Sequence, residues 1–165
     1  GAWTGQIGRA VPAKVGVPHI LTRSNPRARS EADPANLRRW TGCRALVAAG
    51  ATNPPLDLDG RKVPVAQSNN NFVFPGIGLG AVAVKATRVT DRMIDAAAAA
   101  LGRMSPALAD PSEPLLPPVG ELLQIAREVA HAVAVTAIED GVAPAASPDE
   151  ARALIAATQW PPSYR

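Results

Sequence analysis

QSNNNFVFPG, residues 67–76, places three adjacent asparagines directly before an apolar stretch that is spaced by glycines. An asparagine amide offers hydrogen-bond donors and an acceptor without carrying a charge. Three such groups beside a buried element are costly unless they bind a ligand or each other. The segment therefore predicts a binding surface at the point where the chain enters a buried element.

A second amide in a similar setting lies upstream, in Ser24-Asn25-Pro26. It follows residues 17–21, an apolar run that is typical of a buried parallel strand. Proline disfavours helical conformation in the residue before it, so we expect Asn25 to be extended and to point out of the strand's carboxyl end. Ligands bind at that end in open α/β sheets.

Asn25 and Asn70 are the best candidates for binding residues. A neutral amide can hold a carboxylate, a ribose hydroxyl or a nicotinamide carboxamide without adding charge. Asparagine also stabilises turns, and each residue taken singly is explained equally well in that way. Their flanking segments together favour binding.

Strand and helix patterns alternate along the first half of the chain. After the strand at 17–21, a helix is predicted over 33–40 with Asp33 as its N-cap. A second buried strand follows over 44–50, and residues 57–62 form a hairpin-like turn. This alternation is typical of an α/β unit with a parallel sheet.

The second half of the chain reads as helical. Helices are predicted over 76–86, from the cap at Thr90 to Leu101, over 119–140 as far as Gly141, and after the capping box Ser147–Glu150, with a proline-rich connector over 105–118. Residues 76–86 are apolar on every side, which predicts a helix that is buried all round.

Composition allows a core and excludes several classes of protein. Hydrophobic residues make up 47% of the 165 residues and charged residues 19%, so a core can form. The net charge of +3 is spread mostly over single arginines. The densest group has no aromatic interleaving except Trp40 and fits a solvated face or a phosphate-contacting rim, so we expect no nucleic-acid partner. Its members are Arg23, Arg27, Arg29, Arg38, Arg39 and Arg44.

Cysteine and histidine usage argues against a disulfide or a zinc site. Cys43 is the single cysteine, which fits a reducing, cytoplasmic setting. His19 and His131 are too far apart in the sequence to suggest a zinc site. No apolar run is long enough to span a bilayer, so we expect no membrane partner. Because the chain starts abruptly at Gly1, we expect it to be a truncated or excised segment.

The residues Gly78–Ala83 match GxGxxA, a dinucleotide fingerprint. We reject that assignment, because the only strand expected before it is 72–74, which Pro75 interrupts, and no strand follows the helix. Close helix packing explains the glycines better. The glycines concerned are Gly76, Gly78 and Gly80.

Other chemistry-bearing residues have ordinary structural explanations. We expect His19 to be a satisfied core histidine, Cys43 to be inert packing, His131 to be exposed and Lys85 to be a surface lysine. The carboxylates of the helices, Asp91, Asp95, Glu121 and Glu128, are expected on solvated faces. The sequence contains no convincing serine–histidine–acid triad and no convincing carboxylate pair.

Several short motifs occur in a characteristic order. They are Ser24-Asn25-Pro26, Arg38-Arg39-Trp40-Thr41, the strand 44–50, Asp59-Gly60-Arg61, the run 67–80, Val89-Thr90-Asp91 with Met93, Leu115-Leu116-Pro117-Pro118, and Trp160-Pro161-Pro162-Ser163-Tyr164. In this order and spacing the chain resembles the carboxyl-terminal part of malic enzyme, from about residue 1 to the end. The asparagine–phenylalanine–proline–glycine run is highly specific.

The resemblance implies an α/β fold: the second half of a Rossmann-like parallel sheet domain, followed by an α-helical carboxyl-terminal region. Residues 1–69 would be the carboxyl-terminal half of the NAD(P)-binding domain. Residues 70–141 would be helices that return to the malate-binding domain, and residues 142–165 a terminal helix and arm. Asn70 would then sit near a hinge between two domains.

The resemblance also implies oxidative decarboxylation of malate to pyruvate and carbon dioxide, with NAD or NADP and with Mg²⁺ or Mn²⁺. By similarity, Asn25 would contact both substrate and the nicotinamide end of the cofactor. Asn70 would hydrogen-bond the substrate, and Asn69 would support it and contact the cofactor. No catalytic residue or metal ligand is expected in this segment, because the family's lie upstream. The rest of the parent polypeptide and a homo-oligomer are the implied partners.

The chain departs from the family at Arg27, where threonine is usual, at Cys43, where glycine is usual, at Ser68 and at Asn71. Residues 51–53, Ala-Thr-Asn, stand where Ser-Pro is common. The family's catalytic tyrosine and lysine, its acidic metal ligands, its substrate arginine and its glycine fingerprint have no counterpart here. An alternative is therefore a non-catalytic nucleotide-sensing or helix-mediated interaction module from a degenerate gene.

Overall fold

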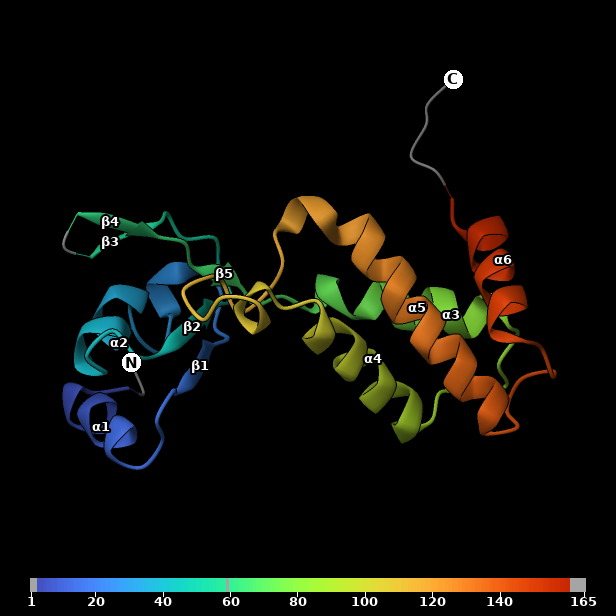
Figure 1. Cartoon of the computed structure of the whole chain (residues 1–165), viewed down its shortest axis with the longest axis horizontal. Coiled ribbons are helices and arrows are strands. Elements are labelled where there is room, and N and C mark those ends of the chain that lie inside the picture. Colours follow the sequence, from blue (N-terminus) through green and yellow to red (C-terminus); the bar gives the residue numbers. More distant parts are fainter. Residues whose placement is uncertain (1–2, 59, 161–165) are drawn as a thin grey trace, which may run out of the picture. The chain divides into compact units, whose positions relative to one another are not determined.

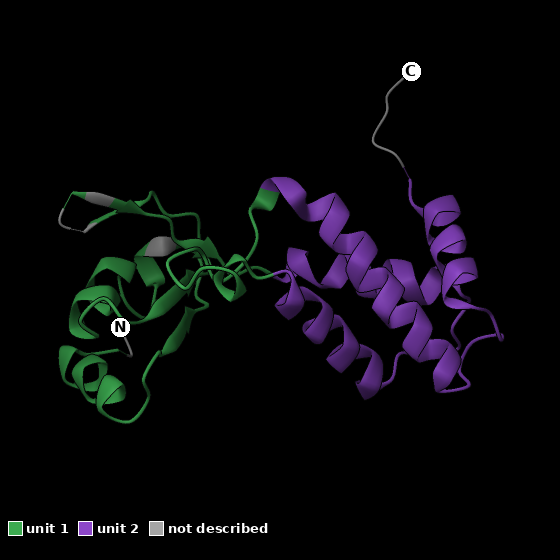
Figure 2. Ribbon diagram, in the orientation of Figure 1, with its two compact units in different colours: residues 1–69, 105–119 green, residues 70–104, 120–165 purple. Residues whose placement is uncertain are grey.

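The computed structural model of the chain describes residues 3–58 and 60–160 (Figure 1). The chain divides into two compact units (Figure 2). Unit 1 contains residues 1–69 and 105–119, and unit 2 contains residues 70–104 and 120–165. The proline-rich connector therefore belongs to unit 1, where it and β5 (Ala66–Gln67) line a hollow of about 410 Å³.

Unit 1 is built on a parallel sheet, which confirms the predicted α/β class. The strands β1 (His19–Thr22), β2 (Leu46–Ala49) and β5 lie in the order β1-β2-β5. Ile20 pairs with Val47, and Ala48 pairs with Ala66. All four residues of β2 are buried, as expected for the central strand of a parallel sheet.

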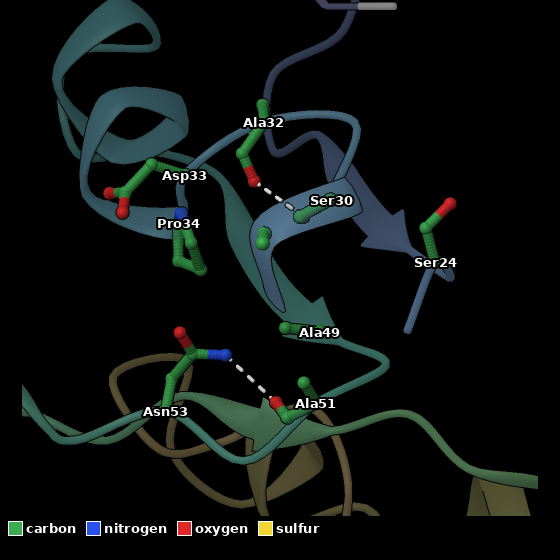
Figure 3. Close-up of a pocket in the computed structure, with 9 residues that line it drawn as sticks. Ser24, Ser30, Ala32, Asp33, Pro34, Ala49, Ala51 and Asn53 are labelled. Carbon is green, nitrogen blue, oxygen red and sulfur yellow. Dashed lines mark hydrogen bonds between the residues drawn. The ribbon is translucent and has the colours of Figure 1, made fainter. Parts of the chain in front are cut away.

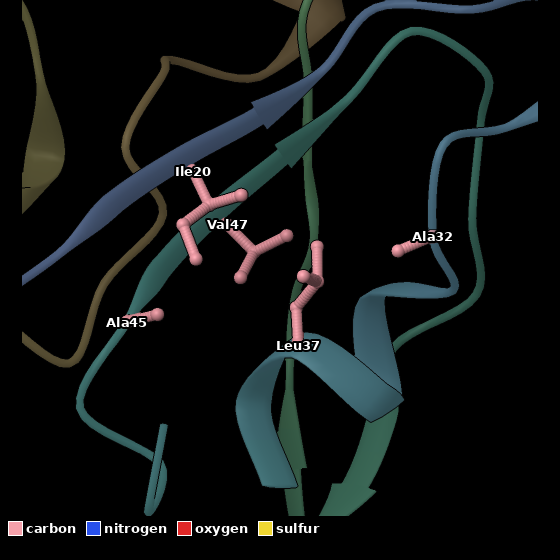
Figure 4. Packing of buried hydrophobic residues seen from close by; sticks show 5 residues of the cluster. All are labelled: Ile20, Ala32, Leu37, Ala45 and Val47. Carbon is pink, nitrogen blue, oxygen red and sulfur yellow. The ribbon is translucent and has the colours of Figure 1, made fainter. Parts of the chain in front are cut away.

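The core of unit 1 lies between this sheet and α2 (Pro34–Trp40). Leu37 of α2 is fully buried and meets Ile20 and Val47, which come from adjacent strands (Figure 4). Burying a leucine of this kind stabilises a fold by about 1.5–3 kcal/mol. The predicted N-cap is confirmed, because the Asp33 carboxylate accepts a 2.8 Å hydrogen bond from the amide of Ala35.

A helical segment precedes this core in the chain. It is α1 (Gly5–Ala10), followed by a 3₁₀ turn at Val11–Ala13, and α1 packs on α2. Gly8 of α1 approaches Trp40 so closely that an added Cβ would lie 2.8 Å from the Trp40 ring. This close approach seats α1 against the end of α2.

Only one face of β1 is buried. Ile20 and Thr22 point into the core, whereas His19 is exposed and Leu21 is 45% exposed. The prediction of a core histidine at His19 is therefore wrong, because neighbouring residues of a strand point to opposite faces.

The third strand was not predicted, and the strand expected at 72–74 is wrong. The chain forms β5 earlier, a 3₁₀ turn at Asn70–Phe72, and then α3 (Phe74–Ala83). Pro75 lies in the first turn of α3, where its missing amide N–H needs no partner. Proline thus starts the helix here instead of breaking a strand.

The predicted hairpin is confirmed. Strands β3 (Leu56–Leu58) and β4 (Arg61–Val63) pair antiparallel. The Asp57 carboxylate accepts hydrogen bonds from the amide of Gly60 at 3.0 Å and from Lys62 Nζ at 2.9 Å. Asp59, which lies within the turn predicted over 57–62, is outside the described residues.

Unit 2 is helical, as predicted. After α3 come α4 (Asp91–Arg103), a 3₁₀ turn at Val119–Glu121, α5 (Leu122–Glu139) and α6 (Pro148–Thr158). Helix α5 contacts α3, α4 and α6. No helix in the described part of the chain has both the length and the apolar character needed to cross a bilayer.

Local capping explains where these helices begin and end. Thr90 Oγ1 accepts from the amide of Met93 at 3.2 Å and donates to Asp140 at 2.6 Å, so it caps α4 and ties it to the end of α5. Gly141 follows α5 with a φ of 66°. The Ser147 capping box before α6 is also present.

Two of the three glycines in α3 allow it to pack closely on α5. An added Cβ at Gly76 would lie 2.6 Å from Val129, and one at Gly80 would lie 2.5 Å from the Ala130 oxygen. Gly78 faces open space, so close packing does not explain it. The helix predicted over 76–86 is not buried all round, since Val82 is 66% exposed.

Residues near the carboxyl end of α2 also differ from expectation. Arg38 is not on a solvated face: it is buried, and its guanidinium donates to the Cys43 carbonyl at 3.3 Å. Cys43 is exposed with a φ of 61°, so the prediction of core packing there is wrong.

His131 of α5 is half-buried, and its Nε2 lies 3.2 Å from the Pro148 carbonyl oxygen. Lys85 is exposed, as predicted.

Candidate functional site

The carboxyl ends of the three parallel strands are aligned at one edge of the sheet. The amide of Gly50 donates to the Thr22 carbonyl at 2.6 Å, and the amide of Ser68 donates to the Ala49 carbonyl at 2.7 Å. These bonds continue the pairing one residue beyond the strands. The segments that follow β1, β2 and β5 therefore leave the sheet side by side, at the edge where ligands bind in open α/β sheets.

A pocket of about 390 Å³ lies at this edge, inside unit 1 (Figure 3). The segment after β1, the start of α2 and the turn after β2 form its walls. Its lining residues are Ser24, Ala28, Ser30, Ala32, Asp33, Pro34, Ala49, Ala51 and Asn53. Small side chains dominate the walls, which leaves room for a ligand beside a few polar groups.

Two buried side-chain oxygens in the described part of the chain have no hydrogen-bond partner. They are Thr22 Oγ1, in the last residue of β1, and Asn53 Oδ1, in the turn after β2. An unsatisfied buried polar group costs about 1–3 kcal/mol. Both groups lie at the carboxyl edge of the sheet, which independently points to this edge as a binding site.

The orientation of the Asn53 amide is dictated by its neighbour. Its Nδ2 donates to the Ala51 carbonyl at 2.8 Å (Figure 3), and only the NH₂ side of the amide can do so. The atom of this amide that has no partner is therefore the acceptor Oδ1, which can accept a hydrogen bond from a ligand hydroxyl or N–H. Asn53 was not predicted as a site residue, although it lies in the 51–53 turn that departs from the family pattern.

Asn25 lies three residues beyond the end of β1 and is exposed. Its peptide bond to Pro26 is cis. The preceding turn is held by Glu31, whose carboxylate accepts from the amides of Arg23 at 3.1 Å and Ser24 at 3.2 Å. Hydrogen bonds from the backbone amide of Glu31 itself and from Ser24 hold the pKa of this carboxyl below its usual value.

The amide run divides between the two units. Asn69 is half-buried and directly follows Ser68, at the end of β5 in unit 1. Asn25 and Asn69 thus follow the two outer strands, β1 and β5, with β2 between them. Asn70 is the first residue of unit 2; it is exposed, and its carbonyl accepts from the amide of Val73 at 3.0 Å.

The residues at this edge suit an uncharged, hydrogen-bonding ligand surface better than a metal centre. Within residues 3–58 and 60–160, no group of three or more histidine, cysteine or acidic side chains is placed to hold a metal ion. The uncharged hydrogen-bonding groups at the edge are the amides of Asn25, Asn53 and Asn69 and the hydroxyls of Ser24 and Ser30. The Asp33 carboxylate, which caps α2, also lines the pocket.

Known proteins to which this chain is similar belong to one family. A family model described as malic enzyme, NAD binding domain, matches residues 1–138. The NAD-dependent malic enzyme of Pseudomonas syringae pv. tomato is 42% identical over 165 residues, which is 100% of this chain and 29% of that protein. That of Aliivibrio fischeri strain MJ11 is 43% identical over 148 residues, 90% of this chain and 26% of that protein.

Solved structures agree with the sequence relatives. The crystal structure of Entamoeba histolytica malic enzyme superimposes with a TM-score of 0.74 at 25% identity, and covers 96% of this chain and 29% of that one. The malic enzyme from Pyrococcus horikoshii gives a TM-score of 0.62 at 27% identity, over 86% of this chain and 29% of that one. This chain spans less than a third of the length of these relatives.

Proposed function

Since this chain belongs to the malic enzyme family, we propose that it serves within an enzyme that oxidises and decarboxylates malate to pyruvate and carbon dioxide with NAD as hydride acceptor. Its contribution is the carboxyl-terminal half of the NAD-binding domain together with a helical region. The observation that carries the proposal is the match of residues 1–138 to the family's NAD-binding domain. NAD rather than NADP is chosen because the relatives are named NAD-dependent.

The residues at the sheet edge fit a dinucleotide. The pocket of about 390 Å³ has the unpaired Asn53 acceptor on one wall. Ribose hydroxyls and a carboxamide N–H are donors that such an acceptor can take. Asn25 and Asn69 follow the ends of the two outer strands, β1 and β5, and would hold the cofactor from the same edge. When bound, NAD accepts the hydride, and this chain's residues bind and orient it.

Neutral amides also suit the substrate. We assign Asn25 and Asn70 to contacts with the carboxylate or hydroxyl of malate, to which an amide N–H donates without adding charge. Uncharged donors fix the orientation of the substrate and leave its charge to be balanced elsewhere. Both side chains belong to exposed residues, so a ligand can reach them.

A Mg²⁺ or Mn²⁺ ion does not fit the described residues of this chain, which hold no suitable ligand group. If the reaction uses one, ligands from outside residues 3–58 and 60–160 are needed to complete its site.

A chimaera tests the proposal directly. Residues 1–165 replace the matching 29% of the Pseudomonas syringae enzyme, and NADH formation is followed with malate, Mn²⁺ and NAD. We expect malate-dependent NADH, and pyruvate in equal amount, from the chimaera. The isolated chain under the same conditions should form neither, because it lacks the remaining parts of its relatives.

Two outcomes would contradict the proposal. A chimaera that is soluble and melts cooperatively but forms no NADH would show that this chain cannot replace the family's segment. It would favour the non-catalytic module instead. NADH formation by the isolated chain would show that the catalytic groups lie within it.

A further inference from the structure

The peptide group between Arg23 and Ser24 is held from two sides. On one side, its N–H, which belongs to Ser24, donates to the Glu31 carboxylate at 3.2 Å. On the other side, the Arg23 carbonyl lies against Gly50, where an added Cβ would be 2.5 Å from its oxygen and 2.8 Å from its carbon. Asn25 is the next residue along the chain, so the orientation of its backbone is set by this clamp.

Glu31 uses both of its carboxylate oxygens in the clamp. Oε1 accepts from the Arg23 amide at 3.1 Å, and Oε2 accepts from the Ser24 amide. Hydrogen bonds to an ionised carboxylate are roughly twice as strong as those between neutral groups. The lowered pKa of Glu31 agrees with this, because backbone N–H donors favour its charged form.

Glu31 is itself fixed to the core. Its carbonyl accepts from the Trp3 amide at 3.3 Å. The next residue, Ala32, belongs to the core cluster with Leu37, and its carbonyl accepts from Ser30 Oγ at 2.8 Å. The carboxylate therefore reaches the turn from a rigid base, and its position is independent of any ligand.

We propose that Glu31 is a positioning residue, which clamps the Arg23–Ser24 peptide against Gly50 so that Asn25 meets cofactor and substrate in one orientation. This inference rests on the proposed function. Glu31 touches neither ligand in it; the residue acts through Asn25. Small misplacements of a group that orients substrate can cost a hundredfold in rate, so a clamp of this kind has a measurable consequence.

The test uses Glu31→Gln in the chimaera. Glutamine keeps the length of the side chain but presents one oxygen and one NH₂, and the NH₂ cannot accept from a backbone amide. We expect kcat/KM for malate to fall about tenfold or more. Gly50→Ala, which pushes the same peptide from the opposite side, should change kcat/KM in the same direction.

Asp57→Asn is the matched control for charge. Asp57 is a carboxylate in unit 1 that, like Glu31, accepts from a backbone amide, although Asp57 is exposed and Glu31 is half-buried. The pKa of Asp57 is lowered by the hydrogen bond it accepts from Lys62 and then by that from Gly60. We expect it to lower the melting temperature as much as Glu31→Gln does while leaving kcat/KM unchanged. Gly16→Ala, where an added Cβ meets open space, is the control for Gly50→Ala.

The outcomes separate this inference from the proposed function. An active chimaera whose kcat/KM is unchanged by Glu31→Gln would overturn the role of Glu31 alone. A folded chimaera that is inactive before any substitution would refute the proposed function. In that case amide hydrogen exchange tests whether the Glu31 carboxylate holds the Arg23–Ser24 peptide. Faster exchange of the Arg23 and Ser24 amides in Glu31→Gln supports this role, and unchanged exchange overturns it.

Discussion

Gly80 of α3 lies against Ala130 of α5 so closely that a methyl group on Gly80 would be 2.5 Å from the Ala130 carbonyl oxygen and 3.0 Å from Val133. The contact at 2.5 Å is with backbone, which cannot move aside as a flexible side chain can. Two residues earlier, Gly78 points to open space. Within α3, the space for replacing glycine by alanine is therefore blocked at Gly80 and open at Gly78.

Gly80→Ala should destabilise unit 2 by about 1–3 kcal/mol, because overpacking forces α3 away from α5. Gly78→Ala should be neutral or stabilise by up to about 1 kcal/mol, since alanine is the better helix former. Urea unfolding followed by the helical circular dichroism signal measures both. Equal stability of the two variants would contradict the backbone contact.

Asn70→Ala in the chimaera should lower kcat/KM for malate by about tenfold or more, through the loss of a hydrogen bond to a charged group. The neighbouring Asn71→Ala is the control, because Asn71 is exposed and has no assigned role. Steady-state kinetics with malate as the varied substrate measure the effect. If both variants behave like the parent, Asn70 does not contact the substrate.

Asn53→Leu should weaken NAD binding by about tenfold, because it removes the acceptor on the pocket wall while roughly keeping the side-chain volume. Thr52→Val is the control: the Thr52 hydroxyl donates to Gln67 at 3.1 Å, and Thr52 does not line this pocket. Calorimetric titration with NAD, and separately with ADP-ribose, shows which half of the cofactor loses the contact. Unchanged affinity for both ligands would remove Asn53 from the site.

Glu150 should make unit 2 more stable at neutral than at acid pH. Hydrogen bonds from the Ser147 amide, and then from its side chain, lower the pKa of Glu150 below 4.5. A lowered folded-state pKa stabilises above the unfolded value and loses this effect as pH falls through the folded value. Glu150→Gln keeps the capping geometry without the charge. Its melting temperature should therefore lie below the parent's above about pH 4.5 and meet it at lower pH; parallel curves would contradict this.

Helix boundaries could be predicted from the sequence because they depend on a few neighbouring residues. Asp33, Thr90 and Ser147 each cap the expected helix with a side-chain oxygen, and Gly141 ends α5 with a positive φ. The parallel sheet followed from the apolar runs. The helix caps depend on residues next to them in the sequence, so no knowledge of the fold was needed to predict them.

Features that depend on distant neighbours were missed. β5 contains only Ala66 and Gln67 and has no pattern of its own; it is a strand because β2 lies beside it. Exposure of His19 depends on which face of β1 is covered. Arg38 was expected on a solvated face, but its guanidinium meets a carbonyl that the turn after α2 brings to it.

The candidate site was partly predictable for the same reason. The strand-end amides Asn25, Asn69 and Asn70 stand out in the sequence. The roles of Glu31 and Asn53 arise only when the fold brings a carboxylate to the end of β1 and turns an amide toward Ala51.

Because residues 105–119 belong to unit 1 while the segments on either side of them belong to unit 2, the chain passes between the units three times. Any single cleavage, including one at a unit boundary, therefore leaves at least one unit divided between two fragments. During synthesis, the last residue that this chain contributes to unit 1 is residue 119. By the time it is added, residues 70–104 of unit 2 have already been translated. The two units are thus interleaved along the chain, and recombination that exchanged either one alone would require more than one crossover.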